Sequence, residues 1–114
     1  MTPWIPWQYE KVWDEFYVQC GTDTQETIDF RLDQLLEKGN LAREPVSKHL
    51  DGDIFELRAK DVRILFYFGA SRTIVFVHAL IKKRGDVPRR DIELAHTRKT
   101  EIEERRRTIN AFSN

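Results

Sequence analysis

Runs of apolar residues separated by short polar breaks dominate the middle of the chain. From Ile54 to Ile81 most residues are Ile, Val, Leu, Phe or Tyr, and polar interruptions occur at 60–61 and 69–72. Aromatic and β-branched runs joined by short turns are typical of an antiparallel meander. The pattern predicts three consecutive strands, near residues 53–59, 62–68 and 73–82.

The alternation within these runs separates the two faces of the predicted sheet. A two-residue turn at Lys60 and Asp61 sets Arg58 directly opposite Arg63, and successive side chains then point to opposite faces. One face is wholly apolar, with Phe55, Leu57, Ala59, Val62, Ile64, Phe66 and Phe68. The other face carries Glu56, Arg58, Arg63, Leu65 and Tyr67, and a similar turn at 70–71 adds His78 (beside Arg63) and Lys82.

Helical periodicity precedes and follows the strands. Apolar residues recur at helical spacing in two N-terminal segments: Tyr9, Trp13, Phe16 and Cys20, then Ile28, Leu32, Leu35 and Leu36. We therefore expect helices near 9–20 and 24–38, forming a hairpin that covers the apolar sheet face. The IPWQY segment is either a first strand or part of a chain that starts directly with helix.

A polar helix is expected from about residue 89, because Pro88 suits the first turn of a helix. Its apolar stripe is thin, and Ile102, Ile109 and Phe112 are too sparse to need burial within the domain. The arginine run 105–107 can contact nucleic acid or pair with glutamates along the helix. The expected fold is α+β, a single domain of residues 1–114 with its core at about 9–98 and a polar helical extension at 99–114. The sheet face of Arg58 and Arg63 is expected to stay open.

Composition excludes several classes of protein. One cysteine, Cys20, permits no internal disulfide, which fits a reducing cytoplasm. The three histidines show no metal-ligand spacing, so we expect no metal and no cofactor. No apolar run approaches the length of a membrane span, so we expect no membrane partner.

Charge is zero overall but unevenly distributed. Residues 1–40 contain three basic and eight acidic residues, whereas residues 41–100 contain thirteen basic and eight acidic ones. A basic strand region indicates a polyanionic partner, although nucleic-acid binders usually carry a larger net positive charge. Two arginines directly opposite each other repel, so Arg58 and Arg63 are expected to hold an anion. The alternative is a solvated face on which they pair with Glu56 and Asp61.

Three sequence blocks then resemble a known family. Residues 48–58 read KHLDGDIFELR, residues 63–68 read RILFYF, and residues 75–88 read VFVHALIKKRGDVP. Their order and spacing resemble the RelE/ParE toxin superfamily, and within it the HigB-like, phage-derived branch, over residues 24–98. The resemblance implies an N-terminal helical hairpin packed on a curved antiparallel sheet of three to four strands, with a C-terminal helix.

The resemblance also implies an activity. Such a protein is the toxin of a bacterial type II toxin–antitoxin system, a cytoplasmic mRNA interferase that cleaves mRNA on the ribosome without a metal. The ribose 2′-OH attacks the adjacent phosphorus while basic side chains stabilise charge on the phosphate oxygens. The catalytic residues implied are Arg58, Arg63, Tyr67, His78, Lys82 and Lys83, with RNA contacts from Lys48, His49 and Arg84. Tyr67 or His78 is the candidate general acid or base.

The sequence departs from the RelE pattern at several positions. Two lysines of RelE match Ile54 and Glu56 here, and no tyrosine follows Tyr67. Glu56 is therefore either a base or a partner of Arg58. Two other functions stay open: a ParE-like poison of DNA gyrase, which typically lacks the basic cluster, and a non-toxic binding module, which fits the missing lysines.

The partner implied is a small antitoxin, often a helix-turn-helix protein, in a toxin–antitoxin hetero-oligomer. It either covers the face of Arg58, Arg63, His78 and Lys82 with carboxylates or engages the stripe of the terminal helix. The second route predicts that a chain lacking residues 100–114 still folds.

Overall fold

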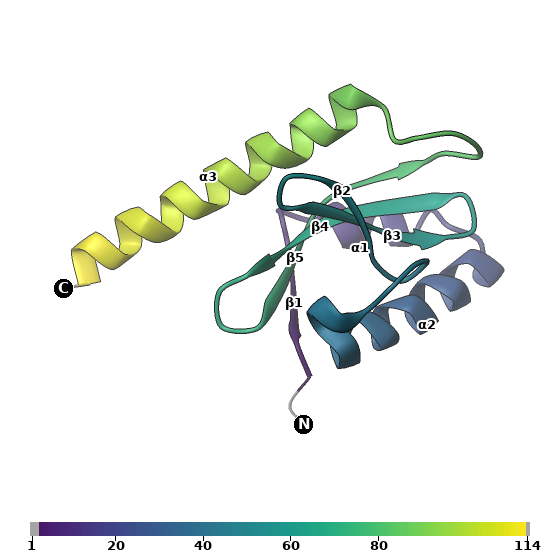
Figure 1. Ribbon diagram of the computed structural model, residues 1–114, viewed down its shortest axis with the longest axis horizontal. Coiled ribbons are helices and arrows are strands. Elements are labelled where there is room, and N and C mark those ends of the chain that lie inside the picture. The colour runs from purple at the N-terminus through teal and green to yellow at the C-terminus, as the bar shows by residue number, and fades with distance from the viewer. Residues whose placement is uncertain (1–2, 114) are drawn as a thin grey trace.

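A five-stranded sheet with helices on both of its faces forms the molecule (Figure 1). The computed structural model describes residues 3–113, with side chains as far as residue 106. The elements in chain order are β1 (Ile5–Gln8), α1 (Val12–Tyr17), α2 (Thr22–Lys38), the 3-10 turn η1 (Gly39–Leu41), β2 (Lys48–Asp51), β3 (Ile54–Ala59), β4 (Val62–Gly69), β5 (Thr73–Ile81) and α3 (Arg89–Ser113). The expected α+β class is confirmed. None of the described helices is long and apolar enough to cross a membrane.

The sheet is wider than the three to four strands expected. Its order is β1-β5-β4-β3-β2, with β1 parallel to β5 and all other neighbours antiparallel. The three central strands lie where the hydrophobic pattern predicts them. The IPWQ segment forms the edge strand β1, and the KHLD segment forms the other edge strand, β2. Three of the four residues of β2 are polar and only Leu50 is apolar, so the segment shows too little alternation to predict a strand.

The N-terminal helical region also differs from the prediction. α1 has only six residues, because β1 occupies the positions before it. Tyr9 packs into the core on the opposite side of the sheet rather than extending the stripe of α1. α2 has 17 residues and buries Ile28 and Leu35. The expected hairpin of two long helices is therefore a strand, a short helix and one long helix.

Two hydrophobic cores lie on the two sides of the sheet. α1 and α2 cover the face predicted to be apolar, where Leu57, Ile64 and Phe66 are buried. α3 crosses the other face (Figure 1). The second core consists of Ile54, Leu65, Tyr67, Val75, Val77, Val87, Ile92, Ala95 and Ile102.

α3 overturns the expectation of an open sheet face. Ile102 is 4% exposed and belongs to the second core, so this residue of the stripe is not free for a partner. Polar contacts hold both flanks of the helix: Arg89 and His96 to Asp51, Lys99 to Asp53, Asp91 to His78, and Glu101 to Tyr9. A thin apolar stripe suffices because these contacts add to it. Ile109 and Phe112 lie outside the residues whose side chains are described.

The predicted strand register is correct for one strand pair and wrong for the next. Arg58 pairs with Arg63 across β3 and β4, as the two-residue turn requires. Between β4 and β5 the turn is one residue longer than expected, because Gly69 pairs with Thr73, and an irregularity between Leu65 and Phe66 shifts the register by one more. His78 then lies opposite Leu65, and Leu80 lies opposite Arg63. A bulge adds one residue to one strand and shifts the partners beyond it. His78 therefore does not lie beside Arg63.

Candidate functional site

Three basic residues lie next to the area that α3 covers, on the same face of the sheet. We call Arg58, Arg63 and Lys82 the basic end. Arg58 on β3 and Arg63 on β4 are direct cross-strand partners and so share a face. Lys82 follows the end of β5, and its backbone N–H donates a 2.7 Å hydrogen bond to the carbonyl oxygen of Asp61. The β3–β4 turn thus ties the end of β5 to the arginine pair.

Arg63 is the buried member of the basic end, only 5% exposed. Its Nη1 donates hydrogen bonds to the carbonyl oxygens of Lys60, at 2.7 Å, and Val62, at 3.0 Å. Its Nε has no hydrogen-bond partner among the described residues. Burial, and then the nearby charge of Arg58, lower the pKa of Arg63. An arginine stays protonated despite such a shift, so a buried positive charge lies beneath the surface here.

Arg58 is the accessible member, with a side chain that is 42% exposed. Its Nη2 lies 3.1 Å from Oε1 of Glu56, which is almost fully buried. The second oxygen of Glu56 has no hydrogen-bond partner in the described part of the chain. The alternative in which the arginines pair with carboxylates is thus realised for Arg58 with Glu56. Arg63 donates to main-chain oxygens instead.

The residues predicted to contact RNA are divided between the two sides of the sheet. Lys48 on β2 is the cross-strand partner of Glu56 and so shares the face of Arg58. His49 is the partner of Phe55 on the opposite face, and its Nε2 lies 2.8 Å from the carbonyl oxygen of Gly52. Arg84 is exposed in the segment that follows β5.

Lys83 also lies apart from the basic end. It is exposed and lines a cavity of about 350 Å³ with Lys60 and Ile81, between the β3–β4 turn and the start of α2. Sequence neighbours at the end of a strand point to different sides, so Lys82 and Lys83 do not act on the same ligand atom.

Tyr67 and His78, predicted as general acid or base, lie beneath α3. Tyr67 is 1% exposed, and burial, followed by the charge of Glu103, raises its pKa to about 12. His78 Nε2 lies 2.7 Å from Oδ1 of Asp91, and Arg98 approaches its other ring nitrogen at 3.5 Å. Both side chains therefore serve the contact between α3 and the sheet. Both share the sheet face of the arginine pair, as expected, but the expectation that this part of the face is open is wrong.

Comparison with protein families assigns this chain to a family. A family model described as phage-derived protein Gp49-like matches residues 16–100, well over half of the chain. The chain belongs to the phage-derived Gp49-like family. The matched region contains every residue of the basic end and starts after β1, so the parallel edge strand lies outside it.

Other comparisons are less informative. The crystal structure of the toxin–antitoxin complex RelBE2 from Mycobacterium tuberculosis contains a similar chain, with 18% sequence identity and a TM-score of 0.44. The alignment covers 74% of this chain and 97% of that chain. An overlap this loose assigns neither a fold nor a function. Among curated proteins, none matches the sequence significantly.

Sequence reasoning missed the residues that decide which part of the face is accessible in this Gp49-like protein. Asp91 and Asp51 hold His78 and His96 across 13 and 45 positions of the chain, respectively. No local sequence pattern predicts contacts between residues so far apart in the chain.

In the described residues no three His, Cys, Asp or Glu side chains lie close enough together to form a metal site. The basic end itself offers two chemical abilities, anion binding and stabilisation of negative charge.

Proposed function

We propose that this Gp49-like protein is the toxin of a type II toxin–antitoxin pair and that it cleaves mRNA on the ribosome without a metal. The arginine pair carries this proposal. The fold sets two guanidinium groups opposite each other on neighbouring strands, one buried and one accessible, at a cost in repulsion. A phosphate group bound there offsets that repulsion. The order of the sequence blocks, which resembles the RelE/ParE superfamily, adds support.

Cleavage forms a bond from the ribose 2′ oxygen to phosphorus and breaks the bond to the 5′ oxygen, while negative charge builds on the phosphate oxygens. Arg58 and Lys82 donate hydrogen bonds to those oxygens, and Arg63 adds positive potential from beneath. Lys48 and Arg84 extend the contact along the RNA backbone. His49 and Lys83 lie on the other side of the sheet and are assigned no contact with the reacting phosphate.

Proton transfer is the step that the basic end does not supply. Tyr67 and His78 reach a substrate only when α3 leaves the sheet, because both are covered by it. With α3 in place, Arg58 and Lys82 stabilise charge, solvent water takes the proton of the 2′-OH, and water returns a proton to the leaving 5′ oxygen. A rate that depends on Tyr67 or His78 therefore reports movement of α3.

The antitoxin that we propose as partner covers the basic end with carboxylates. This route is now favoured over docking on the terminal helix, since Ile102 is buried within the domain. Acidic side chains over Arg58 and Lys82 occupy the positions of RNA phosphates and so block cleavage. The product is a toxin–antitoxin hetero-oligomer.

A second candidate is a non-catalytic member of the same fold, such as a gyrase poison or a binding module. The observation that favours it is the burial of Tyr67 and the Asp91 contact of His78, which keep both candidate general acids or bases away from a ligand at the arginine pair. A non-catalytic protein binds through the basic end and leaves transcripts intact.

Induction in a bacterial host separates these functions. Growth, the ends of cellular transcripts and DNA supercoiling are followed after expression of the wild-type chain. New transcript ends that form only on translated mRNA support the proposal. Growth arrest with intact transcripts and altered supercoiling supports a gyrase poison, and unaffected growth supports a binding module.

Variants of the basic end then test the assignment. Lys82→Ala is expected to lower cleavage about a hundredfold, the usual effect of removing one preorganised charge. Glu56→Gln combined with Arg58→Ala is expected to do the same without stranding a buried carboxylate. Glu56→Gln alone and Arg90→Ala, which removes an arginine with a side chain 89% exposed on α3, are the controls. Undiminished cleavage by both basic-end variants contradicts the assignment.

A further inference from the structure

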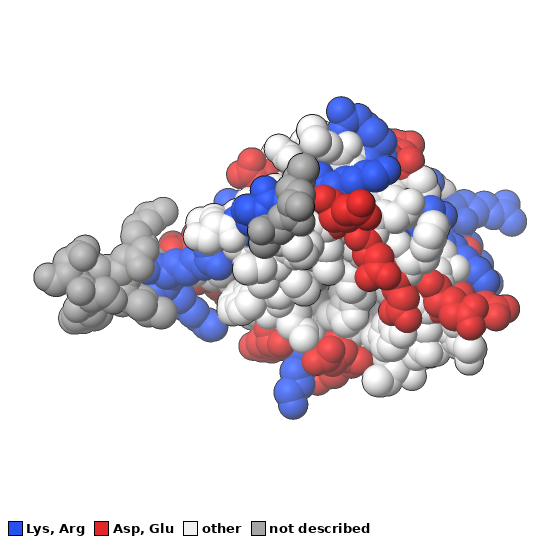
Figure 2. Space-filling view, turned by 90° about the horizontal axis from the view of Figure 1, so that it is seen from below, with Lys and Arg blue, Asp and Glu red and all other residues white. Residues whose placement is uncertain are grey.

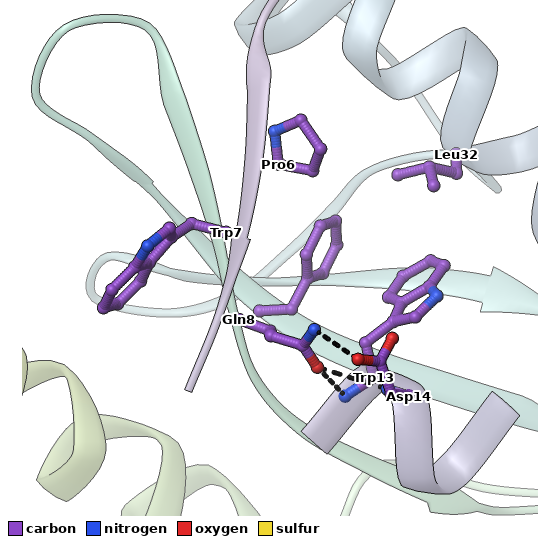
Figure 3. A pocket seen from close by; sticks show the side chains of 7 residues that line it. Pro6, Trp7, Gln8, Trp13, Asp14 and Leu32 are labelled. Carbon is purple, nitrogen blue, oxygen red and sulfur yellow. Dashed lines mark hydrogen bonds between the residues drawn. The ribbon is translucent and has the colours of Figure 1, made fainter. Parts of the chain in front are cut away.

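A pocket on the side of the molecule opposite the basic end has no role in the proposed function. It lies between β1, α1 and α2, has a volume of about 220 Å³, and is lined by Pro6, Trp7, Gln8, Trp13, Asp14, Leu32 and Phe76. Figure 3 shows Pro6, Trp13 and Leu32 around the opening, while Trp7 turns away to the other side of β1. The lining is mostly apolar, with one carboxylate among it.

The walls of this pocket are held in place without a ligand. Gln8 Oε1 accepts hydrogen bonds from the backbone N–H groups of Trp13, at 3.0 Å, and Asp14, at 3.2 Å. Its Nε2 donates to Oδ2 of Asp14 at 3.0 Å. The rings of Trp13 and Phe76 pack with their centroids 4.7 Å apart. Preorganisation of this kind lowers the cost of ordering a site on binding.

Two exposed carboxylates border the pocket residue Leu32 on α2. Asp29 lies one helical turn before Leu32 and so neighbours it on the helix surface, and Asp33 lies one turn after Asp29. Tyr17 on α1 donates a 2.9 Å hydrogen bond to Asp29 and fixes that carboxylate near α1. Figure 2, which views the molecule from the α2 side, shows Asp and Glu side chains in a band across this surface.

The two basic residues of α2 do not neutralise this border. Helical spacing sets Arg31 and Lys38 on the other flank of the helix, away from Asp29 and Asp33. Like charges three or four residues apart destabilise a helix. A cationic group placed over the pocket offsets that cost.

We infer that the pocket binds an arginine or lysine side chain presented by a partner protein. The aliphatic stem lies against Trp13, Leu32 and Phe76, and the charged head meets Asp14, Asp29 or Asp33. A nucleic acid is disfavoured as partner, because carboxylates repel phosphates. The pocket and the basic end lie on opposite faces of the sheet, so both sites can be occupied at once. The inference does not depend on the proposed function.

A pair of model peptides tests the inference. One is a short capped alanine peptide with a central arginine, and the other carries citrulline in that place, which keeps the shape and removes the charge. Binding is followed by NMR on the full-length, isotope-labelled protein. The arginine peptide is expected to shift the indole N–H of Trp13 and the amide of Leu32 saturably, and the citrulline peptide is not.

Two double variants on the same helix complete the test. Asp29→Asn with Asp33→Asn is expected to weaken binding about fivefold, the combined effect of two exposed charge pairs. Asp23→Asn with Glu26→Gln removes the same charge away from the pocket and is expected to leave binding unchanged. The inference is overturned if both double variants lose affinity equally, if shifts spread evenly along α2, or if the arginine peptide shifts neither signal. No RNA enters the assay, so its outcome is independent of the cleavage experiments.

Discussion

Two halves of one sheet face differ in how exposed their side chains are in this protein. In the half beneath α3, Tyr67 is buried and His78 is held by Asp91. In the neighbouring half, the Arg58 side chain is accessible and Lys82 is partly exposed. The same strands and the same alternation supply both halves. The covering helix accounts for the burial of Tyr67 and the restraint of His78.

This contrast separates two requirements of a functional site. A residue must be of the right type on the right face, and it must be accessible. Alternation along β4 meets the first requirement for Arg63 and Tyr67 alike. The second is decided by α3, which leaves charge stabilisation available at the basic end and covers the candidate acid and base.

The largest effect on stability is expected from removing the C-terminal part of α3, the helix that covers Tyr67 and His78. Deletion of residues 100–114 removes the buried Ile102 and the Glu101–Tyr9 hydrogen bond. It should lower the free energy of unfolding by about 3–5 kcal/mol, the range for losing a large buried side chain. Urea unfolding measures the loss, with Ile102→Ala as a single-site comparison and Thr100→Ala as an exposed control. A truncated chain of wild-type stability would show that α3 is not part of the core, as the sequence alone suggested.

The second effect concerns Tyr67 at high pH. Its pKa is about 12 in the folded chain and about 10 when unfolded, so its contribution is complete below pH 10 and is lost as pH rises toward 12. The free energy of unfolding should fall by roughly 2 kcal/mol from this residue over that interval. Unfolding of Tyr67→Phe at several pH values should lack that part of the decline, whereas Tyr17→Phe, outside this core, should retain it. An identical decline in both variants would contradict burial of Tyr67 beneath α3.

The third effect distinguishes the two arginines. Arg63 donates two hydrogen bonds from a buried position, so Arg63→Ala should lower the free energy of unfolding by about 1–3 kcal/mol. The sequence alone had suggested a surface arginine whose loss is nearly neutral. Arg90→Ala, at an exposed site, should change stability by less than about 0.5 kcal/mol. Transcript cleavage by Arg63→Ala is still expected to be lost, and it has to be measured at a temperature where the variant is folded. Equal stability of the two variants would place Arg63 at the surface.

The smallest effect on stability is expected at the polar contacts along the flank of α3. The Lys99–Asp53 pair has a 3.6 Å separation and an Asp53 side chain that is 78% exposed, so Asp53→Asn should cost less than about 0.5 kcal/mol. Asp51, by contrast, has two partners. Its hydrogen bond with His96, and to a lesser extent that with Arg89, lowers its pKa. Its contribution is present at neutral pH and is lost as pH falls through that lowered pKa. The protection of α3 amides against hydrogen exchange, relative to the intrinsic exchange rate at each pH, should therefore fall in acid for the wild type, and Asp51→Asn should remove more of this pH dependence than Asp53→Asn.

Much of the sheet could be read from the sequence because its signals are local. The two-residue turn at Lys60 and Asp61 set the pairing of Arg58 with Arg63, and alternation set the faces. The terminal helix begins near the residue expected, since Pro88 precedes it. The basic end was therefore predictable as a pair of arginines on one face, although their unequal burial was not.

The amino-acid sequence by itself determined the central strands, their two faces and the arginine pair, because neighbouring residues carry that information in their spacing. Tertiary structure alone decided that β1 and β2 join the sheet, that a longer turn and a bulge together set His78 opposite Leu65 instead of Arg63, and that α3 covers Tyr67. Each of these depends on contacts between distant parts of the chain, such as Asp51 with His96. Such contacts form when the chain closes on itself, and their energies come from burial and pairing that no short segment contains.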